Sequence, residues 1–369
     1  MGAFRALTIS LAFAALGLAF EARGQVSVSV LQTNIHRDIG GSDSNTSAQS
    51  ALAQEINYFN PDVWTLQELG GNNVSYNATT AYNDLVAFIQ SDITIFGSNP
   101  KAGSNFYVYL SSLDDNYDTV AIVSRYPFLA TQTYSDAGGG YSALRGMALA
   151  RIDIPGTINF DIFTMHLKAL STTSDAAQRQ AEATADSTNI ANWIASHHAD
   201  AVMATGDFNE TVETNESANW SNHSLGDSIT LKNNTTTTYN PVATLKAAGL
   251  SDPRPVSLNG NLDTISSSSP NARFDYALYG SNLSYTGGLV FNSRLYSSTQ
   301  LATMNAARGT SLTTSTSSTA SDHLAVFETF SVVPEPEVIA LLGLASAMFV
   351  LRAGATHRRR WSRARPAAA

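Results

Sequence analysis

The stretch Ala201-Val-Met-Ala-Thr-Gly-Asp-Phe-Asn209 joins a short apolar run to a glycine, an aspartate and an asparagine. Residues 201–205 are typical of a buried strand, and the glycine that follows permits an unusual backbone angle. The spacing of Asp207 and Asn209 sends both polar side chains the same way, with Phe208 turned into the core. One carboxylate and one amide suit the task of orienting a water molecule while hydrogen-bonding a phosphate oxygen, although an Asx-type turn uses the same residues.

Five further short motifs carry polar side chains of the kinds that bind metal ions or transfer protons. Four of the six motifs follow an apolar run typical of a buried strand. Because ligands of open α/β sheets bind at strand ends, we expect the six motifs to gather at one edge of the fold and form an active site. The five are Leu31-Gln-Thr-Asn34, Asp62-Val-Trp-Thr-Leu-Gln-Glu68, Thr164-Met-His166-Leu167, Arg273-Phe-Asp275-Tyr276 and Ser321-Asp322-His323.

Two of these motifs supply oxygen ligands for a metal ion. Glu68 follows an apolar run, so its carboxylate should emerge at a strand end, and Asn34 ends the neighbouring first strand. Hard cations such as Mg²⁺ take a few carboxylate and amide oxygens and keep several waters. Together the two residues form such a partial shell. Taken singly, Glu68 also fits a helix cap or a solvated carboxylate, and Asn34 fits a turn.

Two of the seven histidines lie directly after or directly before a long apolar run that predicts a strand. His323 precedes the last core strand, and Asp275 lies within an earlier strand. A histidine that a carboxylate orients is a standard acid/base pair, because the anion fixes the tautomer and raises the imidazole pKa. His166 gives a second imidazole, although a single buried histidine is often only a core residue. We assign no role to the others, which are His36, His197, His198, His223 and His357.

The composition fits an ordinary folded protein with a large core and excludes thiol chemistry. Of the 369 residues, 43% are hydrophobic and 14% are charged. The absence of cysteine excludes disulfides, thiolate metal sites and cysteine nucleophiles. Residues 25–333 contain 13 basic and 27 acidic side chains, a net charge of −14. Because general electrostatic binding of nucleic acid usually needs a basic face, a polymeric phosphodiester substrate would depend on a metal ion and a few local arginines.

The first 24 residues have the pattern of a secretory signal peptide. Arg5 is followed by an apolar stretch, residues 6–20, and then by small residues. We expect cleavage between Ala22 and Gln25, and therefore export of the protein. A buried first helix is the alternative, but the stretch has no polar face.

The last part of the chain, residues 332–369, resembles a PEP-CTERM sorting signal. It consists of Val333-Pro-Glu-Pro336, an apolar stretch over residues 338–351 and an arginine-rich end. Fourteen apolar residues are short for a stable span, which needs about 20. The basic end would stay on the cytoplasmic side. The resemblance implies processing by an exosortase-type enzyme, transient association with the inner membrane and a body at the cell surface or outside the cell. A plain C-terminal membrane anchor is the alternative.

Helices and strands alternate through the rest of the chain without an internal linker, which predicts one domain over residues 25–331. An Asn/Ser/Thr-rich surface insertion is expected at 211–240, and another Ser/Thr-rich loop at 311–321. Strands are predicted at 26–33, 63–67, 107–110, 119–124, 147–152, 159–165, 201–205, 274–279 and 324–330. Helices are predicted at 48–59, 81–90, 175–197 and 241–248.

These motifs, in this order, resemble the endonuclease/exonuclease/phosphatase superfamily, which includes deoxyribonuclease I. The resemblance covers residues 28–330. It implies an α/β (α+β) fold, a four-layer sandwich in which two mixed β-sheets pack face to face with helices outside, and an active site at one edge. The matching residues are Asn34, Gln67-Glu68, Ser124-Arg125, His166-Leu167, Gly206-Asp-Phe-Asn209, Asp275-Tyr276 and Ser321-Asp-His323.

The resemblance implies a metal ion and a phosphate-binding site. Asn34 and Glu68 would bind Mg²⁺ or Mn²⁺, with Asp322 nearby. The reaction would be a metal-assisted in-line attack of water on a phosphoester, without a covalent intermediate. Positions where relatives keep phosphate-contacting or histidine-supporting groups are occupied by Arg125, Tyr117 and Asp118.

The resemblance also implies catalytic roles. Asp207 would orient or deprotonate the attacking water, and Asn209 would hold the scissile phosphate. His323, paired with Asp275, would act on water or phosphate, and either Asp207 or His323 would be the base. His166 would contact a phosphate oxygen or help the leaving group.

Departures from individual subfamilies leave the substrate open. Gly70 stands where abasic-site endonucleases usually have lysine, and Thr211 stands where inositol 5-phosphatases carry arginine. We expect an exported nuclease that hydrolyses DNA or RNA. The alternatives are a sphingomyelinase- or phospholipase C-like enzyme, or another phosphoester hydrolase, and an inactive binding module on the cell surface.

Overall fold

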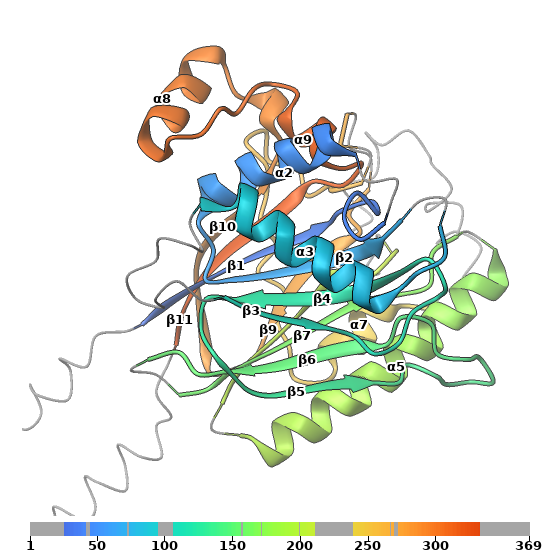
Figure 1. Ribbon diagram of the computed structural model, residues 1–369. Helices are drawn as coiled ribbons and strands as arrows, with labels where there is room; N and C mark the ends of the chain where they lie inside the picture. Colours follow the sequence, from blue (N-terminus) through green and yellow to red (C-terminus); the bar gives the residue numbers. More distant parts are fainter. Residues whose placement is uncertain are drawn as a thin grey trace, which may run out of the picture. The chain divides into compact units, whose positions relative to one another are not determined.

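Two mixed β-sheets lie face to face in the computed structural model, and helices cover their outer faces (Figure 1). The structure describes residues 26–332 except 42–44, 72–73, 95–105, 156–157, 171, 199, 211–238, 266 and 269–271. These residues belong to one compact unit that ends at Val332. The predicted four-layer α/β sandwich is therefore confirmed.

The first sheet has six strands in the order β10-β11-β1-β2-β4-β3, and only β1 and β2 are parallel among its neighbours. The second sheet has the order β5-β6-β7-β8-β9, in which β7 and β8 are parallel. The strands of the first sheet are β1 (Ser27–Asn34), β2 (Val63–Gly70), β3 (Tyr107–Leu110), β4 (Asp118–Ser124), β10 (Leu283–Phe291) and β11 (Ala325–Val332). Those of the second are β5 (Phe128–Tyr134), β6 (Met147–Ile152), β7 (Phe160–His166), β8 (Ala201–Asp207) and β9 (Asp275–Tyr279).

Alternation along the strands produces three apolar cores. Successive side chains of a strand point to opposite faces, so one set packs between the sheets and the other under the helices. In β1, Val28 and Val30 lie in the core between the sheets, whereas Leu31 packs under the helices. In β8, Met203 faces the other sheet and Val202 faces a helix. Two outer cores and one inner core give the four layers.

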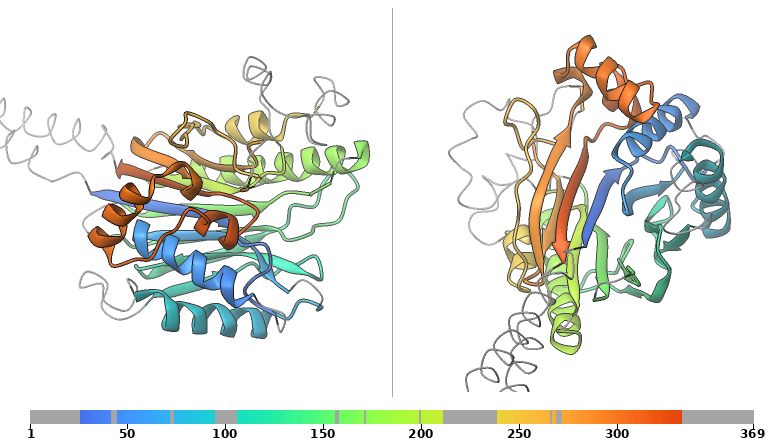
Figure 2. Two further views of the ribbon diagram at one scale, coloured as in Figure 1. Left: turned by 90° about the horizontal axis from the view of Figure 1, so that it is seen from above. Right: turned by 90° about the vertical axis from the view of Figure 1, so that its left-hand side faces the viewer.

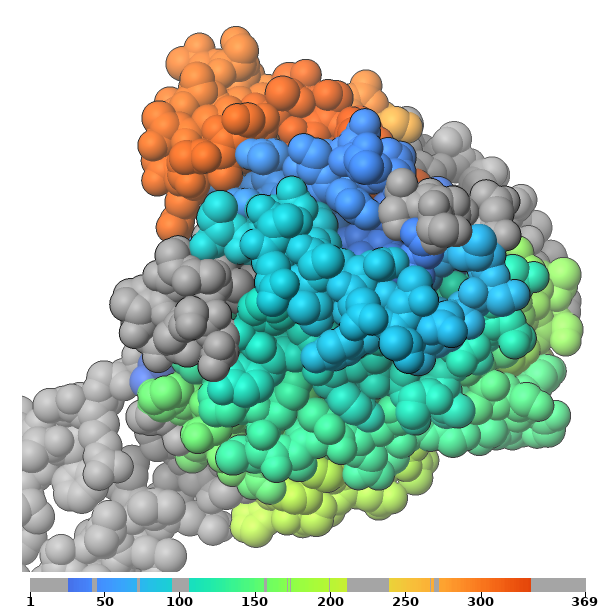
Figure 3. Space-filling model, viewed as in Figure 1, coloured from blue at the N-terminus to red at the C-terminus, as the bar shows by residue number. Residues whose placement is uncertain are grey.

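Helices cover both outer faces, as the two views of Figure 2 show. The first sheet is covered by α2 (Thr46–Phe59) and α3 (Ala78–Asp92), which lie side by side in Figure 3. The second sheet is covered by α5 (Thr173–Ser196) and α7 (Pro241–Lys246). A capping box between Thr172 and Asp175 begins α5, so the helix starts at Thr173, two residues before the predicted start at 175.

Two strands and two α-helices of the structure are absent from the sequence prediction. Strand β5 is mostly exposed, and β10 alternates half-buried with exposed residues around two glycines, so neither has a strong apolar signal. Helix α8 (Ser298–Arg308) buries only Leu301 among its residues, and α9 (Thr316–Ala320) lies in the segment predicted as a Ser/Thr-rich loop. That prediction was wrong, because α9 is stabilised by packing against α2 and not by its own sequence.

Three predictions fall on residues outside those described. They are the signal peptide at 1–24, the sorting signal from 333 onward and most of the insertion at 211–240. Within the described part of the chain, no helix has both the length and the apolar character needed to cross a membrane.

Candidate active site

Strands from both sheets end at one edge of the sandwich, where they carry polar residues of the six motifs. Asn34 ends β1, and the parallel β2 places Gln67 beside it. In the second sheet, the parallel pair β7 and β8 places His166 beside Asp207. A hydrogen bond from Asn34 to Asp207 joins the two sheets at this edge. The motifs of these four strands therefore converge, as the sequence predicted.

Asn34 lies between two carboxylates. Its Nδ2 donates to Glu68 Oε1 and to Asp207 Oδ2, both at 3.0 Å. His166 Nε2 lies 3.6 Å from Asp207 Oδ2 and 3.9 Å from Glu68 Oε1. Asn34, His166 and Asp207 are buried, whereas Glu68 keeps 17% of its side chain exposed. The carboxylate of Glu68 is thus open to solvent above a buried floor.

His323 forms the predicted pair with Asp275. Its Nδ1 lies 2.8 Å from Asp275 Oδ2, and its Nε2 lies 3.6 Å from Asp207 Oδ2. Burial alone would lower the pKa of His323, but the two carboxylates raise it to about 10. Burial also raises the pKa of Asp207, against the opposing effect of the neighbouring histidines. A cationic imidazole therefore stands between Asp275 and Asp207.

Asp118, the first residue of β4, lies beside the second imidazole. Its buried Oδ2 accepts a hydrogen bond from Arg37 Nε at 2.8 Å. Its Oδ1 lies 3.6 Å from Arg145 Nη1 and 3.8 Å from His166 Nδ1. Burial tends to raise the pKa of Asp118, but His166 and the arginines lower it to about 2. An ionised carboxylate thus faces one nitrogen of His166, while the other nitrogen points toward Asp207.

A layer of hydrogen-bonded polar side chains lies beneath these residues and connects the sheets. Gln32 Nε2 donates to Asp275 Oδ1 at 2.8 Å and to Gln67 Oε1 at 2.7 Å. Gln67 Nε2 in turn donates to Thr164 Oγ1 at 2.9 Å. Thr205 donates to Thr65 across the same interface. Gln32 therefore fixes the carboxylate that orients His323.

The backbone at this edge is strained. His36, Arg37, Glu68 and Asn209 have φ values of 50°, 60°, 58° and 48°, in the left-handed region that such residues rarely adopt. Glu68 lies where the register between β2 and β4 shifts. Residues held in such conformations gather at functional sites, because the surrounding structure must compensate for their cost.

Gly206 is required for the close approach of β7 and β8. Its φ is 150°, and a Cβ atom at this position would lie 2.0 Å from the carbonyl oxygen of Met165. No larger residue fits there without movement of the backbone. The glycine therefore places Asp207 directly beside His166.

The residues at this edge fit a divalent cation. One ligand atom from each of Glu68, His166 and Asp207 lies within 4.8 Å of the others. Asp207, Asp275 and His323 form a second such group. Carboxylate oxygens are ligands that Mg²⁺ and similar ions prefer. Asn34 presents its Nδ2 to Glu68 and Asp207 and accepts the His36 N–H with its Oδ1, so its amide would have to rotate to bind an ion through the oxygen.

Residues 31–323 match the model of the "Endonuclease/Exonuclease/phosphatase family". The chain belongs to this family. Its members hydrolyse phosphoric esters with a divalent metal ion, and the chain is an enzyme of that class. The sequence matches none of the curated proteins with which it was compared.

Several solved structures share the fold of this family member. An endonuclease/exonuclease/phosphatase from Beutenbergia cavernae is 14% identical, with a TM-score of 0.52 over 83% of this chain and 72% of that one. The human Nocturnin catalytic domain is 17% identical, with a TM-score of 0.52 over 84% and 97%. A truncated Caenorhabditis elegans TDP2 is 18% identical, with a TM-score of 0.50 over 83% and 98%. At these identities the likeness shows the fold.

Asn209 and Asp322 are two further residues of the family motifs. Asn209 hydrogen-bonds to other residues of the site, whereas the side chain of Asp322 is exposed. The backbone N–H of Asn209 donates to Asp207 Oδ1 at 2.8 Å, so Asn209 lies within the site. Asp322 is exposed and lies 3.9 Å from His36 Nε2, outside both groups of potential metal ligands. His36 had been given no role, yet it lies at this edge, two residues after Asn34.

The position of Arg125 contradicts the role predicted for it. It was expected to contact phosphate, but it follows β4, which runs antiparallel to β2. Ser124 pairs with Val63 at the start of β2, whereas Glu68 lies near its end. Arg125 is buried there, and its backbone N–H donates to Asp62. The other end of β4 lies at the catalytic edge and supplies Asp118.

Arg37 and Arg145 were not identified from sequence. Arg37 lies three residues after Asn34, so its proximity to a motif was the only available signal. Arg145 precedes β6 in an unremarkable Leu-Arg-Gly segment, although its side chain is buried beside Asp118.

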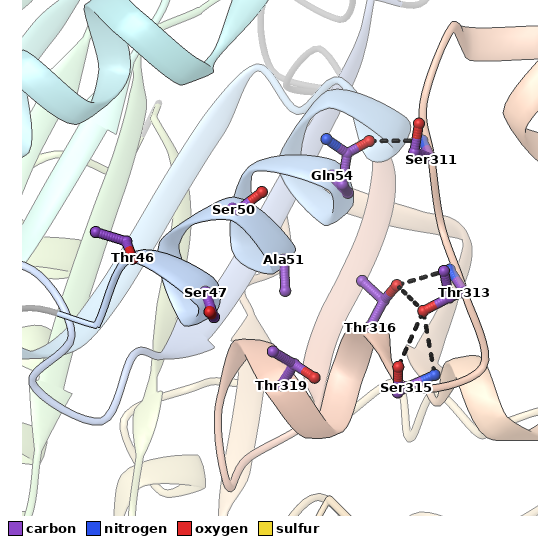
Figure 4. A pocket seen from close by; sticks show the side chains of 10 residues that line it. All are labelled: Thr46, Ser47, Ser50, Ala51, Gln54, Ser311, Thr313, Ser315, Thr316 and Thr319. Carbon is purple, nitrogen blue, oxygen red and sulfur yellow. Dashed lines mark hydrogen bonds between the residues drawn. The ribbon is translucent and has the colours of Figure 1, made fainter.

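A separate pocket has none of the charged or imidazole side chains found at the catalytic edge. The pocket in Figure 4 lies between α2 and residues 311–319. Its volume is about 420 Å³. Eight of its ten lining residues carry a hydroxyl group and none is charged. Without a metal ligand or a cation for phosphate, this pocket is not a candidate for the reaction.

Proposed function

We propose that this hydrolase is an exported phosphodiesterase that cleaves DNA or RNA by in-line attack of water. The observation that carries the chemistry is the position of Asp207. Its Oδ2 accepts a hydrogen bond from Asn34 and lies 3.6 Å from both His166 and His323. A single carboxylate therefore adjoins the metal-type ligands and both imidazoles, where a water molecule and a phosphate can meet.

Asn34 and Glu68 would hold Mg²⁺ or Mn²⁺, and Asp322 is a third candidate ligand. The bound ion would offset the negative charge that develops on the phosphate. Arg37 Nε lies 3.8 Å from Glu68 Oε2, so this edge also has a permanent cation. It is partly exposed and can approach a substrate phosphate, which an acidic protein needs for a polyanionic substrate.

The remaining residues would activate water and hold the phosphate. Asp207 accepts the proton of the attacking water, and the protonated His323, whose orientation Asp275 fixes, faces the phosphate. Asn209 holds a phosphate oxygen through its side chain. His166 contacts another phosphate oxygen or assists the leaving group, and the Asp118 carboxylate lies 3.8 Å from its Nδ1. These roles need no covalent intermediate.

A lipid phosphodiesterase, of the sphingomyelinase or phospholipase C type, is the second candidate. Leu170 lies four residues after His166 and is 69% exposed, and Tyr117, next to Asp118, is 52% exposed. Two exposed apolar side chains near the catalytic edge would suit a lipid substituent. An inactive binding module is disfavoured, because the catalytic set is complete.

Export rests on the two ends of the sequence. The signal peptide and the sorting signal would deliver the enzyme to the cell surface or the medium, with an exosortase-type enzyme as a processing partner. Cell fractionation tests this: we expect the protein outside the cytoplasm with an N-terminus between residues 23 and 25. Recovery of the uncleaved chain in the cytoplasm would contradict it.

The substrate is tested with the full chain and Mg²⁺ on plasmid DNA, RNA and sphingomyelin vesicles in parallel. We expect cleavage of DNA or RNA, and loss of that cleavage in His323→Ala. Cleavage of sphingomyelin with intact DNA and RNA would select the second candidate. No metal-dependent cleavage of any phosphodiester would refute both.

A further inference from the structure

Arg179 is buried beneath the segment that follows His166. It belongs to α5, and only 1% of the residue is exposed. Its Nη1 donates to the carbonyl oxygens of Lys168 at 2.5 Å and Leu170 at 3.0 Å. A buried guanidinium is costly to desolvate, and these two hydrogen bonds from Nη1 offset part of that cost. Arg179 thus holds two carbonyls of one short segment.

That segment is strained and would not keep its shape alone. Leu170 has a φ of 78°, which is unfavourable for a branched apolar residue, and its side chain is 69% exposed. No burial of Leu170 offsets this conformation, so hydrogen bonds to the backbone must maintain it. The bond from Arg179 to the Leu170 carbonyl supplies one of them.

The same guanidinium faces the residue after Asn209. Arg179 Nε lies 3.9 Å from Glu210 Oε2, and both side chains are buried. The two segments also meet directly, because Asn209 Nδ2 donates to the carbonyl oxygen of Leu167 at 3.1 Å. Arg179 therefore lies between the segment after β7 and the segment after β8, and Asn209 links them.

We propose that Arg179 is a positioning residue for the reaction: it places the side chain of Asn209 by holding residues 168–170 and Glu210. The proposal rests on the proposed function, in which Asn209 holds the scissile phosphate. The Leu167 carbonyl accepts from one N–H of the Asn209 amide and so limits the orientations that this amide can adopt. Arg179 fixes the chain on both sides of that contact without touching the substrate.

Arg179 could instead serve only to anchor α5 to the sheet. The experiment must separate this structural role from the positioning of Asn209. Arg151 is the control: it is a half-buried arginine of β6, a strand of the sheet that α5 covers. Its Nη2 lies 2.6 Å from Asp200, which precedes β8 and is therefore at the opposite end from Asp207. Removal of Arg151 should destabilise the fold without moving Asn209.

The test measures kcat of the full chain with Mg²⁺ and bis(p-nitrophenyl) phosphate. Three variants are compared with wild type: Arg179→Met, Arg179→Lys and Arg151→Met. A displacement of about 1 Å can cost on the order of 100-fold in rate, so we expect a loss of that size in kcat for Arg179→Met. Arg179→Lys, which keeps the charge and one ammonium donor, should recover part of the loss. Arg151→Met should keep the wild-type kcat per folded molecule. Equal losses for Arg179→Met and Arg151→Met would overturn the proposal.

A double-mutant cycle identifies the residue through which Arg179 acts. In an Asn209→Ala background, Arg179→Met should cost less than about threefold, because the amide that it positions is already absent. Additive losses would show that Arg179 does not act through Asn209 and would overturn the proposal.

Side-chain amide resonances of Asn209 give a readout that needs no activity. They are assigned by their absence in Asn209→Ala, and they should shift in Arg179→Lys and Glu210→Gln but not in Arg151→Met. Unshifted resonances in both variants would refute the positioning role even if the proposed phosphodiesterase function were correct. An inactive wild-type protein would refute that function alone and leave the resonance test in force.

Discussion

The space between the two sheets is apolar at one end of the strands and polar at the other. Toward the starts of β1 and β8, Val28, Val30, Ala201 and Met203 form part of the inner core. Two to four residues further along the same faces, side chains such as Gln32 replace them and join a hydrogen-bonded network. The same strands and the same alternation therefore build both regions.

The difference separates stability from chemistry. In the apolar half, free energy comes from burial, which is insensitive to small changes of direction. In the polar half, each buried donor or acceptor needs a partner at the correct distance, so the network fixes directions. Asp275 illustrates this: Gln32 holds one of its oxygens and His323 lies at the other. Mutations in the two halves should therefore have different consequences.

The largest effect is expected at the catalytic end, for Asp207→Asn. Loss of a group that moves or orients a proton typically costs 10²–10⁴-fold, so we expect about a 10³-fold lower kcat. Stability should be retained, because burial already disfavours the charged form of Asp207. Steady-state kinetics and urea unfolding check both points. Arg125→Met, at the other end of β4, is the control and should leave kcat unchanged.

A smaller loss is expected in the supporting network, for Gln32→Leu. The Asp275 carboxylate would lose one of its fixed partners, and we expect about a tenfold lower kcat. Unsatisfied groups on Gln67 and Asp275 should also cost about 1–3 kcal/mol of unfolding free energy. A wild-type kcat in this variant would show that the network does not position His323.

In the apolar half, Ile162→Ala should affect stability alone. Ile162 is fully buried in the core between the sheets. Its truncation should lower the free energy of unfolding by about 2–5 kcal/mol, and Ile162→Val by about 1 kcal/mol. Activity per folded molecule should stay at the wild-type level, measured below the unfolding transition. A fall in kcat as large as that of Gln32→Leu would abolish the distinction between the halves.

Glu55 offers a test outside both halves, in the outer core of the first sheet. It is buried in α2 and accepts a hydrogen bond from Ser317, and burial raises its pKa to about 8. The raised pKa means that its stabilising effect is complete below pH 4.5 and is lost as the pH rises to about 8. Glu55→Gln should remove this pH dependence. The free energy of unfolding of the variant, relative to wild type, should therefore be higher at pH 8.5 than at pH 4.5, by roughly 2–5 kcal/mol.

Urea unfolding at the two pH values checks this prediction. Activity should remain unaffected by Glu55→Gln, since Glu55 belongs to neither group of potential metal ligands. An identical pH dependence of stability in wild type and variant would contradict the assignment.

The apolar runs of the sequence were sufficient to predict most core strands and the convergence of the motifs. Strand direction was the missing information. An apolar run does not show in which direction its strand runs. Because β4 runs opposite to β2, Ser124-Arg125 lies at the other end of the pair from Glu68, and Asp118 lies near Glu68. Contacts between residues distant in sequence could not be predicted either: Gln32 and Asp275 are 243 residues apart. Arg145 and Arg179 show no periodicity or motif, because buried cations that bind backbone carbonyls leave no local pattern.

The most direct test is the metal dependence of bis(p-nitrophenyl) phosphate hydrolysis by the full chain. We predict that EDTA abolishes the activity, that added Mg²⁺ or Mn²⁺ restores it, and that Glu68→Gln needs a higher metal concentration than wild type for half-maximal rate. An unchanged rate in EDTA, or the same metal dependence in Glu68→Gln, would contradict a metal-dependent site at Asn34 and Glu68.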